Sequence, residues 1–272
     1  MKKSASTPWW GWLAGALALI GAIGIGLYVA RTGKQPVGTL PGQSALTPQA
    51  ATAPPAGATI QHPIDEAAAG SVVLPALDAS DAAAIEALGG LVGAAGLDAL
   101  LNPEHVIQRI VATIDGLPRQ KLASDALPVR GAQGAFTARK AGAQSEIDPG
   151  NSERYADYAR IAQAIDAKAL VAWYVRFYPL FQQSYRELGY PDGYFNDRLV
   201  FVIDHLLDTP DITEPALLTR PNVMYEFADP ALEQRSAGQK LLLRSGPGNE
   251  AAIKAKLREI RAALTGLELP PA

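Results

Sequence analysis

The sequence predicts a mainly α-helical protein with an N-terminal single transmembrane helix, a disordered linker and a compact multi-helix domain with at most a minor β hairpin. Three observations support this fold class. Twenty uncharged residues follow the short N-terminus, a proline-rich stretch follows them, and the remaining chain places apolar residues at helical spacing. The predicted parts are a cytoplasmic N-terminus (1–8), the membrane helix (9–30), the linker (31–70) and the domain (71–268).

The membrane helix is predicted from the segment Trp9 to Tyr28, which reads WWGWLAGALALIGAIGIGLY. A helix of this length spans about 30 Å, the thickness of the hydrocarbon core of a bilayer. Aromatic residues stand at both ends, where they favour the membrane interface. A cleaved signal peptide is the main alternative, but the best cleavage point, after Ala30, places bulky Tyr28 where a small residue is needed. We therefore expect an uncleaved anchor.

The orientation of the anchor follows from its flanking charges. Lys2 and Lys3 with the α-amine slightly outnumber Arg31 and Lys34, so the positive-inside rule places the N-terminus inside the cell. For a bacterial protein this predicts an inner-membrane location, with the C-terminal domain in the periplasm.

One face of the predicted membrane helix carries a small residue at every fourth position: Ala14, Ala18, Ala22 and Gly26. Such a face allows two helices to approach closely and associate. The alternative is that Ala and Gly are simply abundant in this segment.

The linker is predicted from composition. Residues 31–70 contain six of the 21 prolines of the chain and few large apolar residues. Such a segment buries too little apolar surface to offset the entropy of ordering, so we expect a disordered tether. Its r.m.s. reach is about 35 Å for a flexible chain of this length.

The charge balance argues against a nucleic-acid partner. The chain has a net charge of −3, and residues 1–70 hold four basic and two acidic residues, which leaves −5 for the domain. An acidic domain repels phosphate backbones. The chain contains no cysteine, which excludes disulfides, thiolate metal sites and cysteine nucleophiles.

The domain is predicted to be helical because apolar periodicity coincides with helix-end signals. Residues 117–150 are predicted to form a long loop with a short strand near Phe136, and Val223–Phe227 a second short strand. Each predicted helix has a start signal and most have an end. The helices run from Ser80 or Asp81 to Val92, from Asn102-Pro103-Glu104 to Gly116, from Ser152 to Ala164, from Asp166 to Gly189 and from Asp192 to Pro210. A small helix starts at Asp229-Pro230, and a last helix follows the turn Gly246–Asn249 and reaches Leu264.

The longest of these helices carries a continuous apolar stripe. Pro179 lies inside it, and because proline removes a backbone donor we expect a kink there. The stripe, at spacings of three and four residues, consists of Leu170, Trp173, Tyr174, Phe177, Tyr178, Phe181, Tyr185 and Leu188.

No motif for catalysis, cofactor binding or metal binding is present, and we expect none of these sites. The three histidines form no pair at helical spacing, and the sequence contains neither a GxSxG nor an SxxK motif. The turn Gly246–Asn249 precedes a helix and can in principle hold an anion. It lacks the lysine and hydroxyl of a phosphate loop, and Glu250 follows it, so we interpret it as a capping turn.

Tyrosine and arginine concentrate between residues 154 and 244. Because these residues are enriched in binding hot spots, the concentration favours a docking surface. The alternative is that the rings form the core and the arginines pair with neighbouring acids. The candidate partner-binding residues are Arg154, Tyr155, Arg176, Tyr178, Tyr190, Arg198, Tyr225 and Glu226.

Several sequence segments together resemble a protein family that is found in Gram-negative bacteria and is known only as domain of unknown function 3014. They are HPI, LPALDASD, SERYADY (152–158), YVRFYPLFQQSYRELGYPDGYFNDRLVFVIDHLL (174–207) and VMYEFADPALEQRSAGQKLLLRSGP (223–247). The resemblance covers about residues 62–264 and implies a membrane helix, a variable linker and one domain. It implies no activity, and no functional residue is carried over from it.

The leading hypothesis is a non-enzymatic docking or scaffold module that faces the periplasm and binds an envelope protein or a cell-wall polymer. A second hypothesis is a cell-wall-acting enzyme that uses carboxylates such as Glu187, Asp197 or Glu226. A third is a small-ligand sensor, which requires a closed pocket and a dimer. The sequence leaves the oligomeric state open.

Overall fold

The computed structural model describes residues 59–64, 73–92, 100–123, 126–212 and 214–266. The predicted membrane helix at 9–30, its face of small residues and most of the predicted linker lie outside these ranges. Within them, no helix is both long and apolar enough to span a bilayer.

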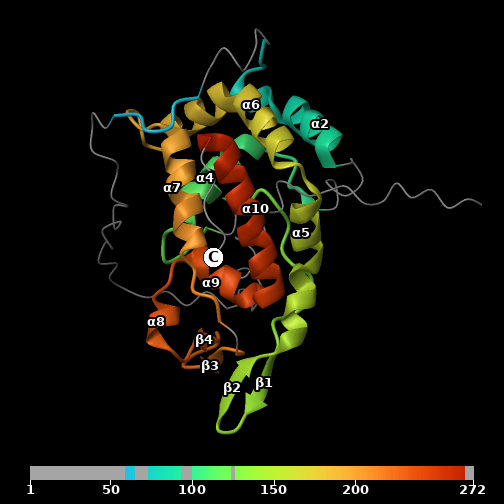
Figure 1. Ribbon diagram of the computed structural model, residues 1–272, viewed down its shortest axis with the longest axis vertical. Coiled ribbons are helices and arrows are strands. Elements are labelled where there is room, and N and C mark those ends of the chain that lie inside the picture. Colours follow the sequence, from blue (N-terminus) through green and yellow to red (C-terminus); the bar gives the residue numbers. More distant parts are fainter. Residues whose placement is uncertain (1–58, 65–72, 93–99, 124–125, 213, 267–272) are drawn as a thin grey trace, which may run out of the picture.

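The described part of the chain is mainly helical, with eight α-helices and a small four-stranded sheet at one end (Figure 1). The helices are α2 (Asp81–Val92), α4 (Val106–Gly116), α5 (Glu153–Ala164), α6 (Ala167–Glu187), α7 (Phe195–Leu207), α8 (Pro230–Glu233), α9 (Ala237–Ser245) and α10 (Pro247–Thr265). The 3-10 turns η3 (Leu77–Ala79) and η5 (Pro149–Ser152) precede α2 and α5. The strands are β1 (Ala138–Ala141), β2 (Gln144–Ile147), β3 (Leu217–Thr219) and β4 (Glu226–Phe227).

The mainly α prediction is confirmed, but the sheet is larger than the predicted minor hairpin. All neighbouring strands are antiparallel, in the order β1-β2-β3-β4. Ser145 of β2 pairs with Leu218 of β3, and Leu218 pairs with Phe227 of β4. The short strand predicted over Val223–Phe227 is present as β4, which occupies its last two residues. Strand β3 has only three residues, too few to show a period of two, so only the pairing in three dimensions reveals it.

The aromatic stripe of α6 forms the centre of the helical core. Phe177 and Tyr185 are 0% exposed and Phe181 is 1% exposed. The rings contact each other, with 5.1 Å between the centroids of Tyr174 and Phe181 and 5.7 Å between those of Trp173 and Phe181. Helices α2, α4, α7 and α10 all contact α6. The predicted stripe therefore faces the core except at Leu188, which lies beyond the end of α6 and is 43% exposed, and α6 continues through Pro179 as one helix.

The start of α4 differs from the prediction. Asn102 does not cap this helix, because its amide group donates to the carbonyl of Leu127 (2.9 Å). Instead, the carboxylate of Asp81 in α2 accepts the backbone N–H groups of His105 and Val106, both at 2.8 Å. The cap comes from a neighbouring helix, so α4 begins at Val106 and local sequence does not reveal its start.

Two helix starts agree with the sequence, whereas Ser152 makes no side-chain cap bond to α5 and α7 begins at Phe195, three residues after the predicted Asp192. Asp166 and Asp229 each accept a backbone N–H in the first turn of α6 and α8, as predicted. Ser236 plays the same role for α9, a helix that the sequence did not predict.

A second, smaller core lies beneath the sheet. It consists of Ile147, Ala216, Leu218, Phe227 and Leu243. Helix α9 joins the two cores, because its residues Leu241 and Leu242 belong to the helical core while Leu243 belongs to the core of the sheet. The residue that follows, Arg244, therefore lies at the boundary between the two.

Residues 59–64 lie against the first turn of α7, at the end of the domain opposite the sheet (Figure 1). The carboxylate of Asp197 accepts the N–H of His62 at 2.7 Å, and the hydroxyl of Tyr194 accepts the N–H of Ile64 at 2.7 Å. This short part of the predicted linker is thus held by the domain through its main chain.

Candidate functional site

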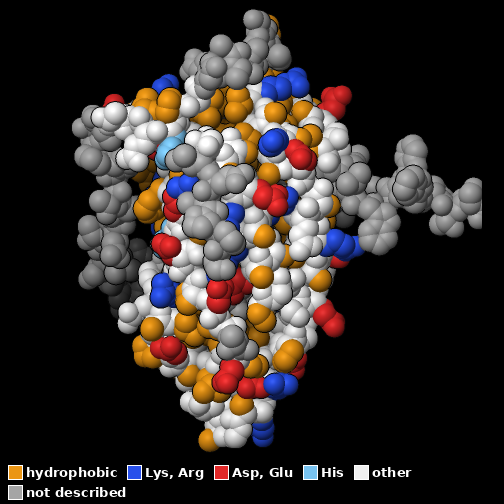
Figure 2. Space-filling model, in the orientation of Figure 1, with side chains coloured by type: hydrophobic (Ala, Val, Ile, Leu, Met, Phe, Trp, Pro, Cys, Tyr) orange, Lys and Arg blue, Asp and Glu red, His pale blue; other side chains and the backbone are white. Residues whose placement is uncertain are grey.

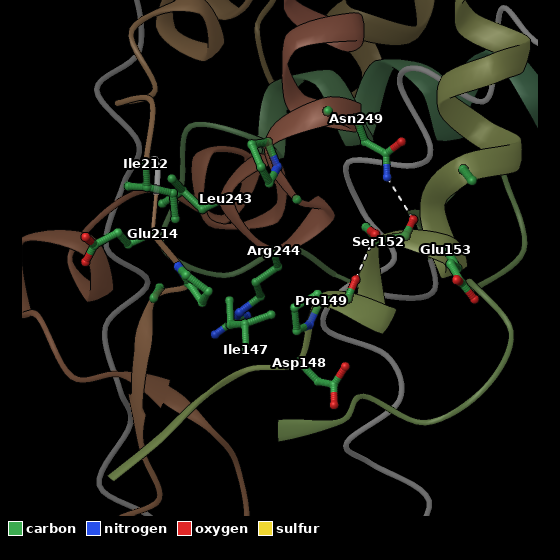
Figure 3. A pocket seen from close by; sticks show the side chains of 16 residues that line it. Ile147, Asp148, Pro149, Ser152, Glu153, Ile212, Glu214, Leu243, Arg244 and Asn249 are labelled. Carbon is green, nitrogen blue, oxygen red and sulfur yellow. Dashed lines mark hydrogen bonds between the residues drawn. The ribbon is translucent and has the colours of Figure 1, made fainter. Parts of the chain in front are cut away.

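A cleft of about 420 Å³ lies where the helical core meets the sheet (Figure 3). One wall is formed by the end of β2, η5 and the start of α5. The second wall consists of Ile212 and of Glu214, Pro215 and Ala216 before β3, and the third is the junction between α9 and α10. Apolar side chains such as Ile147, Ile212 and Leu243 line much of the cleft. Its size lies within the range of small-ligand sites.

Gly246 permits the close contact between two walls of the cleft. Its φ is +90°, and an added Cβ atom would lie 2.9 Å from the Cβ atom of Ser152. The side chain of Asn249 then joins the walls, because it donates to the carbonyls of Ser152 (2.8 Å) and Ser245 (2.9 Å). The start of α10 is therefore fixed against the start of α5.

The N-terminus of α10 borders the cleft with backbone donors. The N–H of Glu250 makes the first helical hydrogen bond, to the carbonyl of Gly246 at 2.9 Å. Pro247 has no N–H, and the amides of Gly248 and Asn249 lie before that first bond, beside the cleft. Such amides and the helix dipole favour a negative charge.

Arg244 is the one cation among the described residues that line the cleft. Its guanidinium lies 5.0 Å from the ring centroid of Phe227 and donates a long hydrogen bond (3.4 Å) to the carbonyl of Tyr225. Burial lowers the pKa of the Arg244 guanidinium below its ordinary value. Figure 3 shows the side chain reaching from α9 toward Ile147.

No ion pair among the described residues includes Arg244. Nearby Glu233 is already engaged, because it pairs with Lys240 at 2.8 Å and accepts the N–H of Phe227 at 2.9 Å. Buried charges are normally paired, since desolvation without a partner is unfavourable. The negative charges of Glu233 and Glu226 favour the charged form of Arg244, but neither carboxylate forms an ion pair with it.

The buried lysines of the same region show the usual arrangement. Lys254 is 3% exposed and pairs with Glu250 at 2.8 Å and with Asp211 at 2.6 Å. Lys256 is 6% exposed and pairs with Glu259. In contrast to Arg244, each of these cations has a carboxylate partner.

Two predicted partner-binding residues, Tyr190 and Arg198, instead bind Asp115, a carboxylate at the end of α4. Asp115 is 2% exposed; Arg198 approaches its Oδ1 at 3.0 Å, and the hydroxyl of Tyr190 donates to its Oδ2 at 3.1 Å. Arg119 also pairs with it. This network links α4 to α7 and to the segment before α7.

The tyrosine hydroxyls of this network lie in an environment that disfavours ionisation. Tyr185 stacks on Tyr190, with 4.6 Å between ring centroids, and burial raises the pKa of the Tyr185 hydroxyl to about 12. Burial also raises the pKa of Tyr190, and nearby Asp115 adds to the effect.

The other predicted residues do not form one surface. Tyr155 and Tyr178 are each 2% exposed and lie in the core, the alternative that the sequence left open. Arg154 donates to the carbonyls of Gln133 and Gly134, and Arg176 lies exposed on α6.

Tyr225 and Glu226 lie close to the cleft, next to Phe227 of the sheet core. The carbonyl of Tyr225 accepts the hydrogen bond from Arg244. The guanidinium carbon of Arg220 lies over the ring of Tyr225, 5.2 Å from the ring centroid. Glu226 begins β4 and pairs across the ladder with Thr219.

The carboxylates considered for catalysis have separate surroundings. Glu187 accepts from the side chain of Gln183 at the end of α6. Asp197 binds main-chain N–H groups at the first turn of α7, whereas Glu226 belongs to β4, at the other end of the domain (Figure 1). In the part of the chain that the structure describes, no cluster of three or more His, Asp or Glu residues is arranged to hold a metal ion.

The sequence does not indicate an anion site at this cleft, because it places the acidic residue Glu250 directly after the turn Gly246–Asn249. That residue is expected to repel an anion. In the structure Glu250 is 2% exposed, pairs with Lys254 and is not among the residues that line the cleft. Gly246 precedes α10 and Pro247 to Asn249 form its first turn without a side-chain cap, and all four residues border the cleft.

The surface facing the viewer in Figure 2 carries acidic and basic side chains side by side. A continuous basic surface, which nucleic-acid-binding proteins usually present, is not seen on that face.

Comparison with known proteins gives one match. A family model described as "Protein of unknown function (DUF3014)" matches residues 106–261. No curated protein and no solved structure matches the chain.

Replacing Arg198 tests whether the Asp115 network stabilises the fold. We expect Arg198→Ala to lower the free energy of unfolding by about 2–3 kcal/mol, because it removes the ion-pair partner of a buried carboxylate. Arg176→Ala, at an exposed position, is the matched control and should change it by less than about 0.5 kcal/mol. Urea unfolding of the full-length variants measures both values. Equal stability of the two variants would return Arg198 to the candidate partner-binding residues.

Replacing Gly246 tests the contact between the walls of the cleft. We expect Gly246→Ala to lower the free energy of unfolding by about 1–3 kcal/mol, because alanine disfavours a positive φ and its methyl group would meet Ser152. Gly248→Ala is the control, since nothing lies within 4 Å of its added Cβ. A thermal unfolding curve for each variant checks the prediction, and a loss of stability only in Gly248→Ala would contradict it.

Proposed function

The chain belongs to the DUF3014 family of proteins of unknown function, and from this premise we propose that it is a membrane-tethered, non-enzymatic binding module of the bacterial envelope. In this proposal the cleft beside Arg244 binds an anionic group of another envelope component, an envelope protein or a cell-wall polymer. The observation that carries the proposal is a partly buried guanidinium without an ion pair, in an apolar cleft that a helix N-terminus borders.

The proposed location depends on the N-terminal sequence. The uncharged stretch 9–30 anchors the chain in the inner membrane, and residues 31–58 connect it to the segment that Asp197 and Tyr194 hold. The domain then extends into the periplasm, with the sheet end far from the point where the linker joins it (Figure 1). A small-residue face at Ala14, Ala18, Ala22 and Gly26 would allow two anchors to associate.

Docking is supported by exposed apolar side chains at the sheet end of the domain. Leu217 of β3 is 43% exposed, and Val223 in the segment between β3 and β4 is 74% exposed. Leu217 follows Ala216, which lines the cleft, and Val223 lies two residues before Tyr225, whose carbonyl accepts a hydrogen bond from Arg244. A central charged anchor with surrounding apolar area is a common arrangement in protein interfaces.

The N-terminal segment is tested by membrane extraction. We expect the full-length protein to remain in the membrane fraction after carbonate treatment, because 20 uncharged residues hold it in the bilayer. A variant that lacks residues 1–30 should leave the membrane fraction. A mature chain that begins near Arg31, or full-length protein that carbonate releases, would contradict this part of the proposal.

The cleft is tested by crosslinking in living cells. A photoreactive amino acid at Ala156, which lines the cleft, should capture an envelope component in the full-length protein. Arg244→Gln should reduce this capture about tenfold, because a charge-assisted hydrogen bond is lost. Arg176→Gln is the matched control and should leave capture unchanged. Equal capture by the two variants would contradict a binding role for Arg244.

A further inference from the structure

The cleft separates positive and negative charge. Arg244 lies within it, whereas Asp148, Glu153 and Glu214 lie on different sides around it (Figure 3). Glu153 and Glu214 are exposed, and no ion pair among the described residues includes any of the three acids. Asp148 uses one carboxylate oxygen to accept the N–H of Gly150 at 2.8 Å.

This pattern discriminates between classes of ligand. A phosphate or a strip of anionic lipid headgroups would place several negative charges beside three carboxylates, which is unfavourable. A purely cationic ligand would meet the guanidinium of Arg244. The charges complement a ligand that carries one negative group and, a few ångströms away, one positive group.

From these observations we infer that the cleft binds the C-terminal end of a peptide that also carries a basic residue. This inference rests on the proposed function and specifies its ligand. The terminal carboxylate is held by Arg244 and by the amides of Gly248 and Asn249 at the start of α10. The basic side chain lies near the acidic residues at the edge of the cleft.

Three features of the site suit a peptide end. A planar guanidinium matches the geometry of a carboxylate and can bind both of its oxygens. Backbone amides at a helix start are a recurring way to capture a C-terminal carboxylate. The volume of about 420 Å³ and the walls of Ile147, Ile212 and Leu243 accept small apolar side chains but not a folded element.

The position of the cleft fits a partner that approaches from outside. Residues 59–64 are held at the opposite end of the domain, beside the first turn of α7 (Figure 1). Residues 59–64 themselves therefore lie away from the cleft.

Calorimetric titration of the full-length protein with the tripeptide Lys-Ala-Ala tests the inference. We expect binding of the peptide with a free carboxylate and a loss of affinity of about tenfold or more when the C-terminus is an amide, because the charged partner of Arg244 is removed. Replacing the lysine of the peptide by glutamate should weaken binding about two- to fivefold or more, since the edge carboxylates then repel it.

Protein variants separate the two ends of the ligand. Arg244→Gln should reduce the affinity for Lys-Ala-Ala about tenfold and make the free acid and the amide equivalent. Glu214→Gln should reduce the preference for lysine over glutamate and keep the preference for the free acid. Glu187→Gln, at the end of α6, is the matched control and should change neither preference.

The outcomes distinguish this inference from the proposed function. If inorganic phosphate binds as tightly as the free-acid peptide and Arg244→Gln abolishes both, a peptide end is the wrong ligand while anion binding stands. Equal affinity for the free acid and the amide overturns the inference. If Arg244→Gln also leaves capture from Ala156 unchanged in cells, the proposed function falls with it.

Discussion

The burial of one aromatic stripe on α6 determines most of the arrangement of this domain. Phe177, Phe181 and Tyr185 are almost fully buried, and α2, α4, α7 and α10 pack around the helix that carries them. Large rings bury much apolar area and contribute strongly to a core. Their polar ends also need partners: the hydroxyl of Tyr174 donates to Asn196 of α7, which fixes the angle of that helix. The tyrosines that suggest a binding surface in the sequence are therefore used to hold helices together.

Sequence reasoning succeeded where structure is local. The period of α6, the caps at Asp166 and Asp229 and the end of α4 at Gly116 all depend on residues within one or two turns of each other. It failed where a partner comes from elsewhere in the chain. Asp81 sets the start of α4 from α2.

Two elements escaped prediction for different physical reasons. Strand β3 is too short to show alternation, and it pairs with β2, about seventy residues earlier in the chain. Helix α9 spans only nine residues, fewer than the window over which helical periodicity is recognised, and its Leu241 to Leu243 are divided between two cores.

The candidate site depends on the same distinction. Arg198 and Arg244 look alike in the sequence. Only their three-dimensional neighbours show that Arg198 pairs with the buried carboxylate of Asp115, while no ion pair among the described residues includes Arg244, although Glu233 and Glu226 favour its charge. The consequence for function follows from electrostatics. A guanidinium in apolar surroundings with no carboxylate partner is unfavourable for folding unless something else compensates it. The ring of Phe227 and the carbonyl of Tyr225 offset part of this unfavourable free energy of burying the guanidinium.

A carboxylate of a bound ligand would offset the remaining part. Ligand binding should therefore also raise the free energy of unfolding of the domain. An arginine kept only for the fold would gain more from a carboxylate supplied by the chain itself, as Lys254 gains from Glu250.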